Sequence, residues 1–382
     1  MIEMSSWREI LRGMLDNPYH YLSTEDASEI YYNASLSDLM YAAMENRNAK
    51  VPGKIVTYLV DRNINYTNIC TINCHFCSFY RPPGHPENYT QSIDQISRRV
   101  SELEEIGGTR ILMQGGVNPD LGISWYEELL NELSERHPRI DLDCFSPIEI
   151  EGISDVSGIP TLEVLSRFKS AGLHGLPGGG AEMLVDNVRS GISPLKGSSK
   201  NWLRIMGEAQ KLGLVTSATN VFGFGESISD RVEHLDKIRE LQQSTIQSGN
   251  PGFTSFISWP VMLENNVFGR MNRGSNKLKL GSGSVEYLRH VAVSRLFLSN
   301  FDHIQSSWPT MGIKVAQIAL NGGADDIGST MMEENVVSAS GTTKTEATII
   351  ELQNSIIQAG YVPAKRDSKY NIVETKNPII NQ

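Results

Sequence analysis

Short β-rich runs that alternate with longer amphipathic stretches are the feature that most constrains how this chain of 382 residues can fold. From residue 55 onward, apolar runs of strand length are followed by stretches whose apolar residues recur at helical spacing. Strands joined in this way by helices form parallel sheets. We assign strands to residues 56–61, 110–113, 140–145, 172–176, 215–222, 254–257, 303–305 and 324–328.

Helical patterns lie between these runs, for example over 92–106, 125–136, 162–171, 202–212, 230–243 and 285–298. Eight such units over about 275 residues match the size and order of an α/β fold, the (β/α)₈ TIM-type barrel. An open barrel of about six strands is the alternative, because the last two runs are short and polar. The sequence predicts an N-terminal helical extension over 1–54, the barrel over 55–340, and a C-terminal helical segment and tail over 341–382.

The composition narrows the class of protein. A hydrophobic share of 40% argues against disorder, and a net charge of −10 argues against nucleic-acid or anionic-membrane partners. The apolar stretches are too short to span a bilayer, and the first residues do not resemble a targeting signal. We therefore expect a cytoplasmic protein whose thiols are reduced, which favours metal binding or catalysis over disulfides.

Three of the four cysteines lie in one window, Cys70-Thr-Ile-Asn-Cys74-His-Phe-Cys77, on the loop that follows the first predicted strand. Chemistry in such barrels sits on loops of this kind. A structural zinc site needs four ligands, but His75 is adjacent to Cys74, and Cys144 is expected in the core. Three thiolates suit an iron–sulfur cube with one open iron, while a zinc loop is the alternative.

The window, with Phe76 just before its last cysteine, resembles the radical S-adenosylmethionine (radical SAM) family. The resemblance implies a [4Fe–4S] cluster on Cys70, Cys74 and Cys77, whose open iron chelates the amino and carboxylate groups of S-adenosylmethionine. One electron from the cluster then cleaves the sulfonium and yields a 5′-deoxyadenosyl radical. The family fold is a full or partial β/α barrel, and a flavodoxin or ferredoxin is its expected electron donor.

Further segments resemble one branch of this family, the cyclases of the futalosine route to menaquinone. They include the residues 61–68, 79–81, 113–116, 145–147, 176–182, 305–308 and 328–335. The implied substrate is dehypoxanthine futalosine, a ribose attached to a benzoate. The radical would abstract a ribose hydrogen, the substrate radical would attack the ring, and loss of a proton and an electron would leave a spirocyclic product.

Other functions share part of this pattern. Aminofutalosine synthase and the deazaflavin-forming F₀ synthase halves share the wider pattern, but Phe79-Tyr-Arg81 and Ser306-Ser-Trp308 favour the cyclase. A non-enzymatic, zinc-stapled binding protein is the distant alternative.

The resemblance also assigns roles to residues at strand ends. Gln114, Gly115 and Gly116 would hold the methionine amino group of S-adenosylmethionine, and the glycines would let the backbone approach a ligand closely. Ser146 would contact the same ligand, and Glu182 would accept hydrogen bonds from its ribose hydroxyls. Phe76 completes the predicted cofactor-binding set.

Further residues are needed to bind the substrate and to accept the final proton. The benzoate carboxylate requires a cationic partner, and the aromatic ring requires an aromatic wall. Related sequences commonly carry a histidine where Phe224 stands, so the acceptor of the final proton is sought elsewhere. The candidates are Arg62, Arg81 and Arg189 for the carboxylate, Trp259 and Trp308 for the wall, and Glu226 and His85 for the proton.

Overall fold

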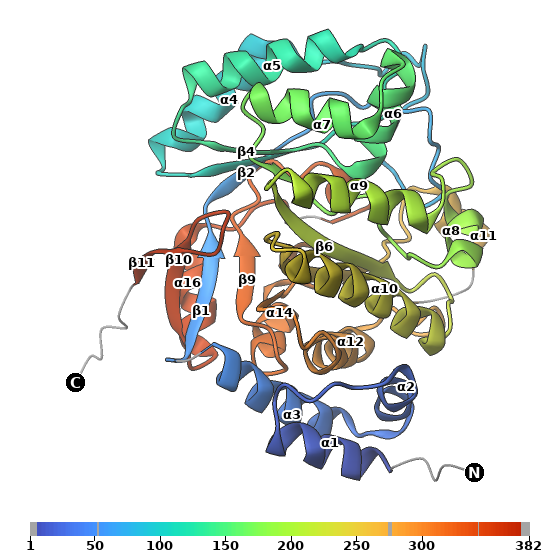
Figure 1. The fold of residues 1–382 in the computed structure, drawn as a ribbon, viewed down its shortest axis with the longest axis vertical. Helices are drawn as coiled ribbons and strands as arrows, with labels where there is room; N and C mark the ends of the chain where they lie inside the picture. Colours follow the sequence, from blue (N-terminus) through green and yellow to red (C-terminus); the bar gives the residue numbers. More distant parts are fainter. Residues whose placement is uncertain (1–5, 52, 274–276, 343, 376–382) are drawn as a thin grey trace.

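The computed structural model describes residues 6–51, 53–273, 277–342 and 344–375. Residues 1–5 and 376–382, which belong to the predicted N-terminal extension and C-terminal tail, lie outside the described residues. One curled sheet forms the centre of the molecule, and helices cover its outer side (Figure 1).

The sheet has eleven strands in the order β11-β10-β1-β9-β8-β7-β6-β5-β4-β3-β2. All neighbouring pairs are parallel except β10 and β11. The strands are β1 (Ile55–Leu59), β2 (Asp61–Ile64), β3 (Arg110–Met113), β4 (Asp141–Cys144), β5 (Gly175–Leu176), β6 (Val215–Phe222), β7 (Phe253–Pro260), β8 (His303–Gln305), β9 (Asp326–Ser329), β10 (Val362–Arg366) and β11 (Ile372–Thr375).

The sheet curls back to its own beginning. β1 and β2 follow one another with only Val60 between them, yet they stand far apart in the strand order. β1 pairs with β9, and β2 pairs with β3, so residues 55–64 join the two ends of the sheet. The expected α/β barrel architecture is therefore confirmed, and each of the eight predicted runs holds a strand.

The C-terminal segment contains more than the helix that the sequence predicts. Helix α16 (Ile349–Gln358) is present, but β10 and β11 follow it and join the sheet. β10 runs parallel to β1, from Ile55 opposite Val362 to Tyr58 opposite Lys365. Its sequence, Val-Pro-Ala-Lys-Arg, lacks the apolar alternation of a strand, so only pairing with β1 reveals it.

The helices begin where the sequence provides caps. Ser23, Ser92 and Thr348 accept hydrogen bonds from backbone amides in the first turn of their helices. The remaining helices are α1 (Trp7–Asp16), α2 (Thr24–Asn33), α3 (Leu36–Lys50), α4 (Ile93–Glu105), α5 (Ile123–Arg136), α6 (Pro147–Ser157), α7 (Thr161–Ser170), α8 (Asp186–Ile192), α9 (Ser199–Lys211), α10 (Ile228–Gln247), α11 (Val267–Met271), α12 (Ser284–Phe297), α13 (Trp308–Met311), α14 (Ile313–Leu320) and α15 (Val336–Ala339).

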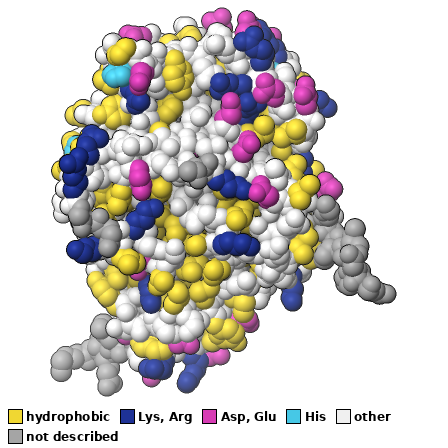
Figure 2. Space-filling model, turned by 180° about the vertical axis from the view of Figure 1, so that it is seen from behind, with side chains coloured by type: hydrophobic (Ala, Val, Ile, Leu, Met, Phe, Trp, Pro, Cys, Tyr) yellow, Lys and Arg dark blue, Asp and Glu magenta, His cyan; other side chains and the backbone are white. Residues whose placement is uncertain are grey.

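The N-terminal helices α1 to α3 lie together at the end of the molecule where β1 begins, next to α12 (Figure 1). They leave the opposite end, where the carboxyl ends of the parallel strands meet, free for loops. No helix in the described part of the chain is long and apolar enough to cross a membrane. The face in Figure 2 carries basic and acidic side chains interspersed rather than a basic stripe.

Candidate active site

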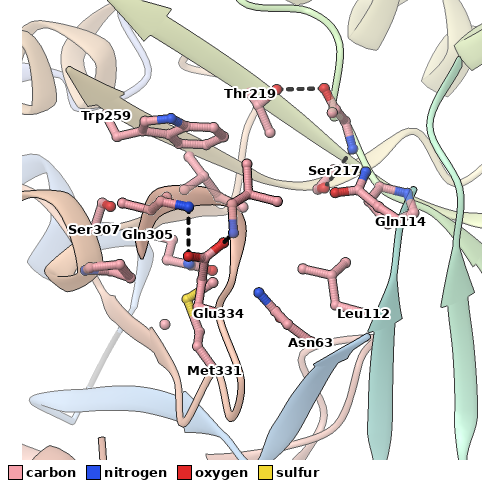
Figure 3. A pocket seen from close by; sticks show the side chains of 18 of the residues that line it. Asn63, Leu112, Gln114, Ser217, Thr219, Trp259, Gln305, Ser307, Met331 and Glu334 are labelled. Atoms are coloured by element: carbon pink, nitrogen blue, oxygen red, sulfur yellow. Dashed lines mark hydrogen bonds between the residues drawn. The ribbon is translucent and has the colours of Figure 1, made fainter. Parts of the chain in front are cut away.

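A cavity of about 330 Å³ lies inside the curled sheet (Figure 3). Every strand from β2 to β10 contributes lining residues, for example Asn63 of β2, Asp143 of β4 and Arg366 of β10. The cysteine loop contributes Phe76 and Cys77. The cavity therefore joins the barrel interior to the loop that carries the three clustered thiols.

The cysteine loop is held in place by backbone hydrogen bonds to distant segments. Cys70 N donates to Arg81 O at 3.0 Å, and His75 N donates to Ile192 O at 2.9 Å. The His75 carbonyl accepts from Phe268 N at 2.7 Å, and its ring Nδ1 lies 3.1 Å from Gly191 O. The His75 ring therefore contacts α8 through Nδ1.

The three thiols suit a cluster better than a single ion. Cys70, Cys74 and Cys77 are half-buried and unbridged, and Cys144 is buried in β4. Burial, and secondarily the neighbouring thiol of Cys74, raises the pKa of Cys77 to about 11, so the three groups lie within electrostatic reach. Within the described residues, no three His, Cys, Asp or Glu side chains converge as ligands of one metal ion. An iron–sulfur cube binds each thiolate on a different iron, so it does not require the thiols to converge on one ion.

The glycines after β3 serve packing against the cysteine loop. A Cβ on Gly116 would stand 2.1 Å from Ile69 O and 2.7 Å from Cys70 Cβ. A Cβ on Gly115 would stand 2.7 Å from the Tyr66 ring. Their close backbone approach is thus to other parts of the protein, and of the predicted triplet only Gln114 lines the cavity.

Glu149, a residue that sequence reasoning missed, accepts hydrogen bonds from three segments next to the residues predicted to bind S-adenosylmethionine. Its Oε1 accepts from Tyr66 Oη at 2.8 Å and from Gly115 N at 2.9 Å, and its Oε2 accepts from Ser146 Oγ at 2.6 Å. Burial raises the pKa of Glu149 to about 7, while these hydrogen bonds act in the opposite direction. It lies in the first turn of α6, where a carboxylate is favoured.

Glu182 lines the cavity beside a buried cation that the sequence did not single out. Its Oε1 lies 2.9 Å from Lys196 Nζ, and its Oε2 is buried without a hydrogen-bond partner. Lys196 Nζ stands 5.1 Å from the centre of the Phe76 ring. Burial lowers the pKa of Lys196, but Cys74 and Glu182 outweigh it and raise the pKa. Lys196 therefore carries positive charge next to the cysteine loop.

The three predicted arginines are used within the protein. Arg62 pairs with Glu102 at 2.5 Å and with Glu333 at 2.8 Å, and Arg81 pairs with Glu87 at 2.6 Å. Arg189 is buried and donates to the carbonyls of Gly180, Ala181 and Gly197. None of the three is among the lining residues, which include Arg110 and Arg366 instead.

Both predicted tryptophans line the cavity. The Trp259 ring projects from β7 above the cavity (Figure 3). Trp308 is buried, and its Nε1 donates to Ser329 O at 3.0 Å. Trp259 therefore presents the more accessible aromatic surface.

The two predicted proton acceptors lie outside the cavity lining. Glu226 is buried and accepts from Gly223 N at 2.9 Å, Phe224 N at 2.6 Å and Arg231 Nε at 2.6 Å. These bonds fix the loop after β6. His85 lies on the far part of the cysteine loop, where its Nδ1 accepts from Glu87 N at 3.2 Å. The Phe224 ring packs against Phe76, with 5.5 Å between centres.

Comparison with known proteins identifies the class of this molecule. Residues 64–238 match the radical SAM superfamily, and residues 250–379 match the CofH/MqnC C-terminal region. Two solved structures share the fold. Methylornithine synthase (PylB) aligns with a TM-score of 0.70 and 16% identity, over 93% of this chain and 97% of that one. The FeFe-hydrogenase maturase HydG from Carboxydothermus hydrogenoformans aligns with a TM-score of 0.72 and 17% identity, over 95% of this chain and 81% of that one. The chain belongs to the radical SAM superfamily and is an enzyme.

Its curated relatives narrow the group further. The chain is 43% identical to a cyclic dehypoxanthine futalosine synthase of Halalkalibacterium halodurans, over 93% of this chain and 92% of the relative. It is 39% identical to the protein of that name from Streptomyces coelicolor, over 91% and 85%. It is 37% identical to a 5-amino-6-(D-ribitylamino)uracil–L-tyrosine 4-hydroxyphenyl transferase of Archaeoglobus fulgidus, over 84% and 90%.

Proposed function

We propose that this enzyme converts dehypoxanthine futalosine into cyclic dehypoxanthine futalosine in menaquinone biosynthesis. The observation that carries the proposal is the 43% identity to a synthase of that name over 93% of the chain. The transferases of the same superfamily match with lower identity, 37% or less among those compared. Aminofutalosine or F₀ synthesis is the alternative activity within the superfamily.

In this proposal Cys70, Cys74 and Cys77 hold a [4Fe–4S] cluster. The cluster and S-adenosylmethionine, when bound, supply a 5′-deoxyadenosyl radical that takes a hydrogen atom from the substrate. The fit rests on three thiols on one anchored loop that borders the cavity. Lys196 adds positive charge beside Cys74, which favours thiolates at this loop. We place the protein in the cytoplasm, with a flavodoxin or ferredoxin as electron donor.

The residues assigned to S-adenosylmethionine are Phe76, Gln114 and Glu182, which line the cavity, whereas Ser146 is buried outside that lining. The buried Oε2 of Glu182 accepts no hydrogen bond from the protein and lies 3.8 Å from the Arg189 guanidinium, so it is an acceptor suited to a ribose hydroxyl. Ser146 donates its only hydroxyl proton to Glu149, so we assign it a positioning role together with Glu149. Gly115 and Gly116 act through packing rather than through direct contact.

On the substrate side, we keep Trp259 as the wall for the aromatic ring. Arg62, Arg81 and Arg189 already bind groups of the protein, so we assign none of them to the substrate carboxylate. We also withdraw the proton-acceptor role from Glu226 and His85, because both lie outside the cavity lining.

The test is the product formed anaerobically from S-adenosylmethionine, a reductant and each possible substrate. We expect the cyclic product from dehypoxanthine futalosine, together with 5′-deoxyadenosine. A Cys74→Ala variant should contain less iron and form neither, while a Cys144→Ala variant should still form both. Turnover of tyrosine with 5-amino-6-(D-ribitylamino)uracil, without any cyclic product, would show that the substrate assignment is wrong.

A further inference from the structure

One part of the cavity wall, which we call the floor, is formed by Asn63, Arg110, Leu112, Asp143 and Arg366. Two of its polar side chains, Asn63 and Asp143, lie at one level of the sheet. Asn63 of β2 stands opposite Leu112 of β3, and Leu112 stands opposite Asp143 of β4. All three line the cavity, and Figure 3 shows Asn63 and Leu112 reaching toward it from neighbouring strands. Two strand spacings, roughly 10 Å, separate the backbones of Asn63 and Asp143. One ligand group cannot bridge that distance, but two groups on opposite edges of a ring can.

Each of these side chains offers an oxygen that the protein leaves unsatisfied. Asn63 Oδ1 and Asp143 Oδ1 are buried and lack a hydrogen-bond partner, and the residues are only 7% and 5% exposed. Buried acceptors in folded proteins nearly always have a partner. Both atoms belong to cavity-lining residues, so a ligand in the cavity is the available source of donors.

The charges at the floor select the kind of donor. Arg110 forms ion pairs with Asp61 and, at 3.4 Å, with Asp143 Oδ2, and Arg366 pairs with Asp326 at 2.5 Å. Three carboxyl groups thus face two guanidinium groups, which leaves no spare positive charge for an anion. Burial raises the pKa of Asp143 to about 7, so a further carboxylate there would be opposed. A neutral hydroxyl, which both donates and accepts, fits this floor.

We propose that Asn63 and Asp143 form a sugar subsite that binds two hydroxyls of the substrate. The sugar then lies on the floor, between β2 and β4. The benzoate ring stands away from the floor, against Trp259, and its carboxylate points away from Asp61, Asp143 and Asp326. This assignment rests on the proposed function and adds the orientation of the substrate to it.

The test measures equilibrium binding of substrate and fragments to the cluster-loaded protein, without turnover. The ligands are dehypoxanthine futalosine, its analogues lacking one sugar hydroxyl, and a benzoate fragment without the sugar. The variant Asn63→Leu removes the acceptor at similar volume, and Asp143→Asn removes the charge. Asn187→Leu makes the same side-chain change on the exposed surface of α8 and is the control.

We expect the wild-type protein to bind one deoxy analogue about tenfold more weakly than the substrate. Asn63→Leu should bind the substrate about tenfold more weakly than the wild type, but should lose no further affinity for that analogue. The benzoate fragment should bind both proteins alike, and Asn187→Leu should match the wild type. Cluster content and thermal midpoint of each variant identify a protein that failed to fold, and Asp143→Asn then provides the second measurement.

Two results would overturn the subsite. One is an equal loss of affinity for the substrate and every deoxy analogue in Asn63→Leu and Asp143→Asn. The other is a loss of affinity for the benzoate fragment, which would place the ring at the floor. A wild-type protein that turns over another substrate and does not bind dehypoxanthine futalosine would instead overturn the proposed function, and this subsite with it.

Discussion

Single buried side chains decide how the cofactor side of the cavity is arranged. Glu149 receives donors from the end of β2, the loop after β3 and the end of β4, which are far apart in the sequence. It therefore acts as a positioning residue: it orients the groups that we assign to S-adenosylmethionine without itself lining the cavity. Lys196 plays a comparable part beside Glu182 and Phe76.

Replacing Glu149 by Gln should weaken S-adenosylmethionine binding by about tenfold, equivalent to about 1.4 kcal/mol. The amide nitrogen cannot accept, so either the Ser146 hydroxyl or the Gly115 amide loses its acceptor. Equilibrium dialysis with labelled S-adenosylmethionine measures the change. Glu151→Gln, on the same helix, is the control. Unchanged affinity at equal iron content would contradict the positioning role.

The same carboxyl predicts a pH dependence of stability. Burial raises the pKa of Glu149 from 4.5 to about 7, and it raises the pKa of Asp143 from 3.8 to about 7. A group whose pKa is higher in the folded state binds its proton there more readily, so it favours folding at low pH. This contribution is complete below the unfolded pKa and is lost as the pH rises through about 7.

We therefore expect the free energy of unfolding of the cluster-free chain to fall by about 4 kcal/mol between pH 5.5 and pH 8, about half of it from each group. Urea unfolding at several pH values measures this profile. Glu149→Gln removes one of the two groups, so its profile should be flatter. A variant profile parallel to that of the wild type would show that Glu149 does not titrate in this range.

At the scale of the elements, the loop after β3 packs directly against the cysteine loop, which carries the proposed cluster ligands. Gly116 allows this contact because any Cβ would overlap Ile69 O and Cys70 Cβ. The positions of the thiols thus depend on a glycine in a different β/α unit.

Gly116→Ala should displace the cysteine loop and lower the bound iron to less than half of the wild-type value. The cost of such overpacking is about 1–3 kcal/mol. Iron and sulfide analysis after anaerobic reconstitution measures the loss, and far-UV circular dichroism should be unchanged. Gly13→Ala, where a Cβ meets nothing within 4 Å, is the control and should load fully. Full loading of Gly116→Ala would mean that the loops adjust to one another.

At the scale of the whole molecule, the strand β10 completes the sheet next to β1 and supplies part of the cavity floor. Its Arg366 is buried and pairs with Asp326 of β9, across the intervening β1. Asp326 also accepts from Thr57 Oγ1 at 2.6 Å. The ion pair and this hydrogen bond together link β1, β9 and β10, and β1 is remote from the other two in the sequence.

Arg366→Met should lower the free energy of unfolding by about 3–5 kcal/mol, because it leaves Asp326 buried without its cation. The urea midpoint reports the effect, and the double variant with Asp326→Asn should recover part of the loss. Lys369→Met, an exposed neighbour, should unfold like the wild type. If Arg366→Met were as stable as Lys369→Met, the pairing of β10 with the sheet would not depend on the ion pair between Arg366 and Asp326.

Much of the fold was accessible from the sequence because it rests on local signals. The alternation of strand and helix periods predicted β1 and every strand from β3 to β9, whereas the first predicted run, 56–61, reached only the first residue of β2. The spacing Cys70–Cys74–Cys77 singled out a loop that borders the cavity. Gln114, Glu182 and Trp259, which the sequence placed at strand ends, line the cavity, and their roles stay predictions. Spacing along the chain determines these features, so no knowledge of distant contacts is needed.

The tertiary structure decided which charged residues meet. Arg62, Arg81 and Arg189 looked available near predicted loop mouths. In the structure Arg62 pairs with Glu102 and Glu333, Arg81 pairs with Glu87, and Arg189 donates to backbone carbonyls. Arg110 and Arg366 lie within strands, and only the curl of the sheet brings them to one floor. Glu149, Lys196 and β10 were missed for the same physical reason. Pairing between segments tens to hundreds of residues apart depends on long-range packing, which leaves no periodic mark in the sequence.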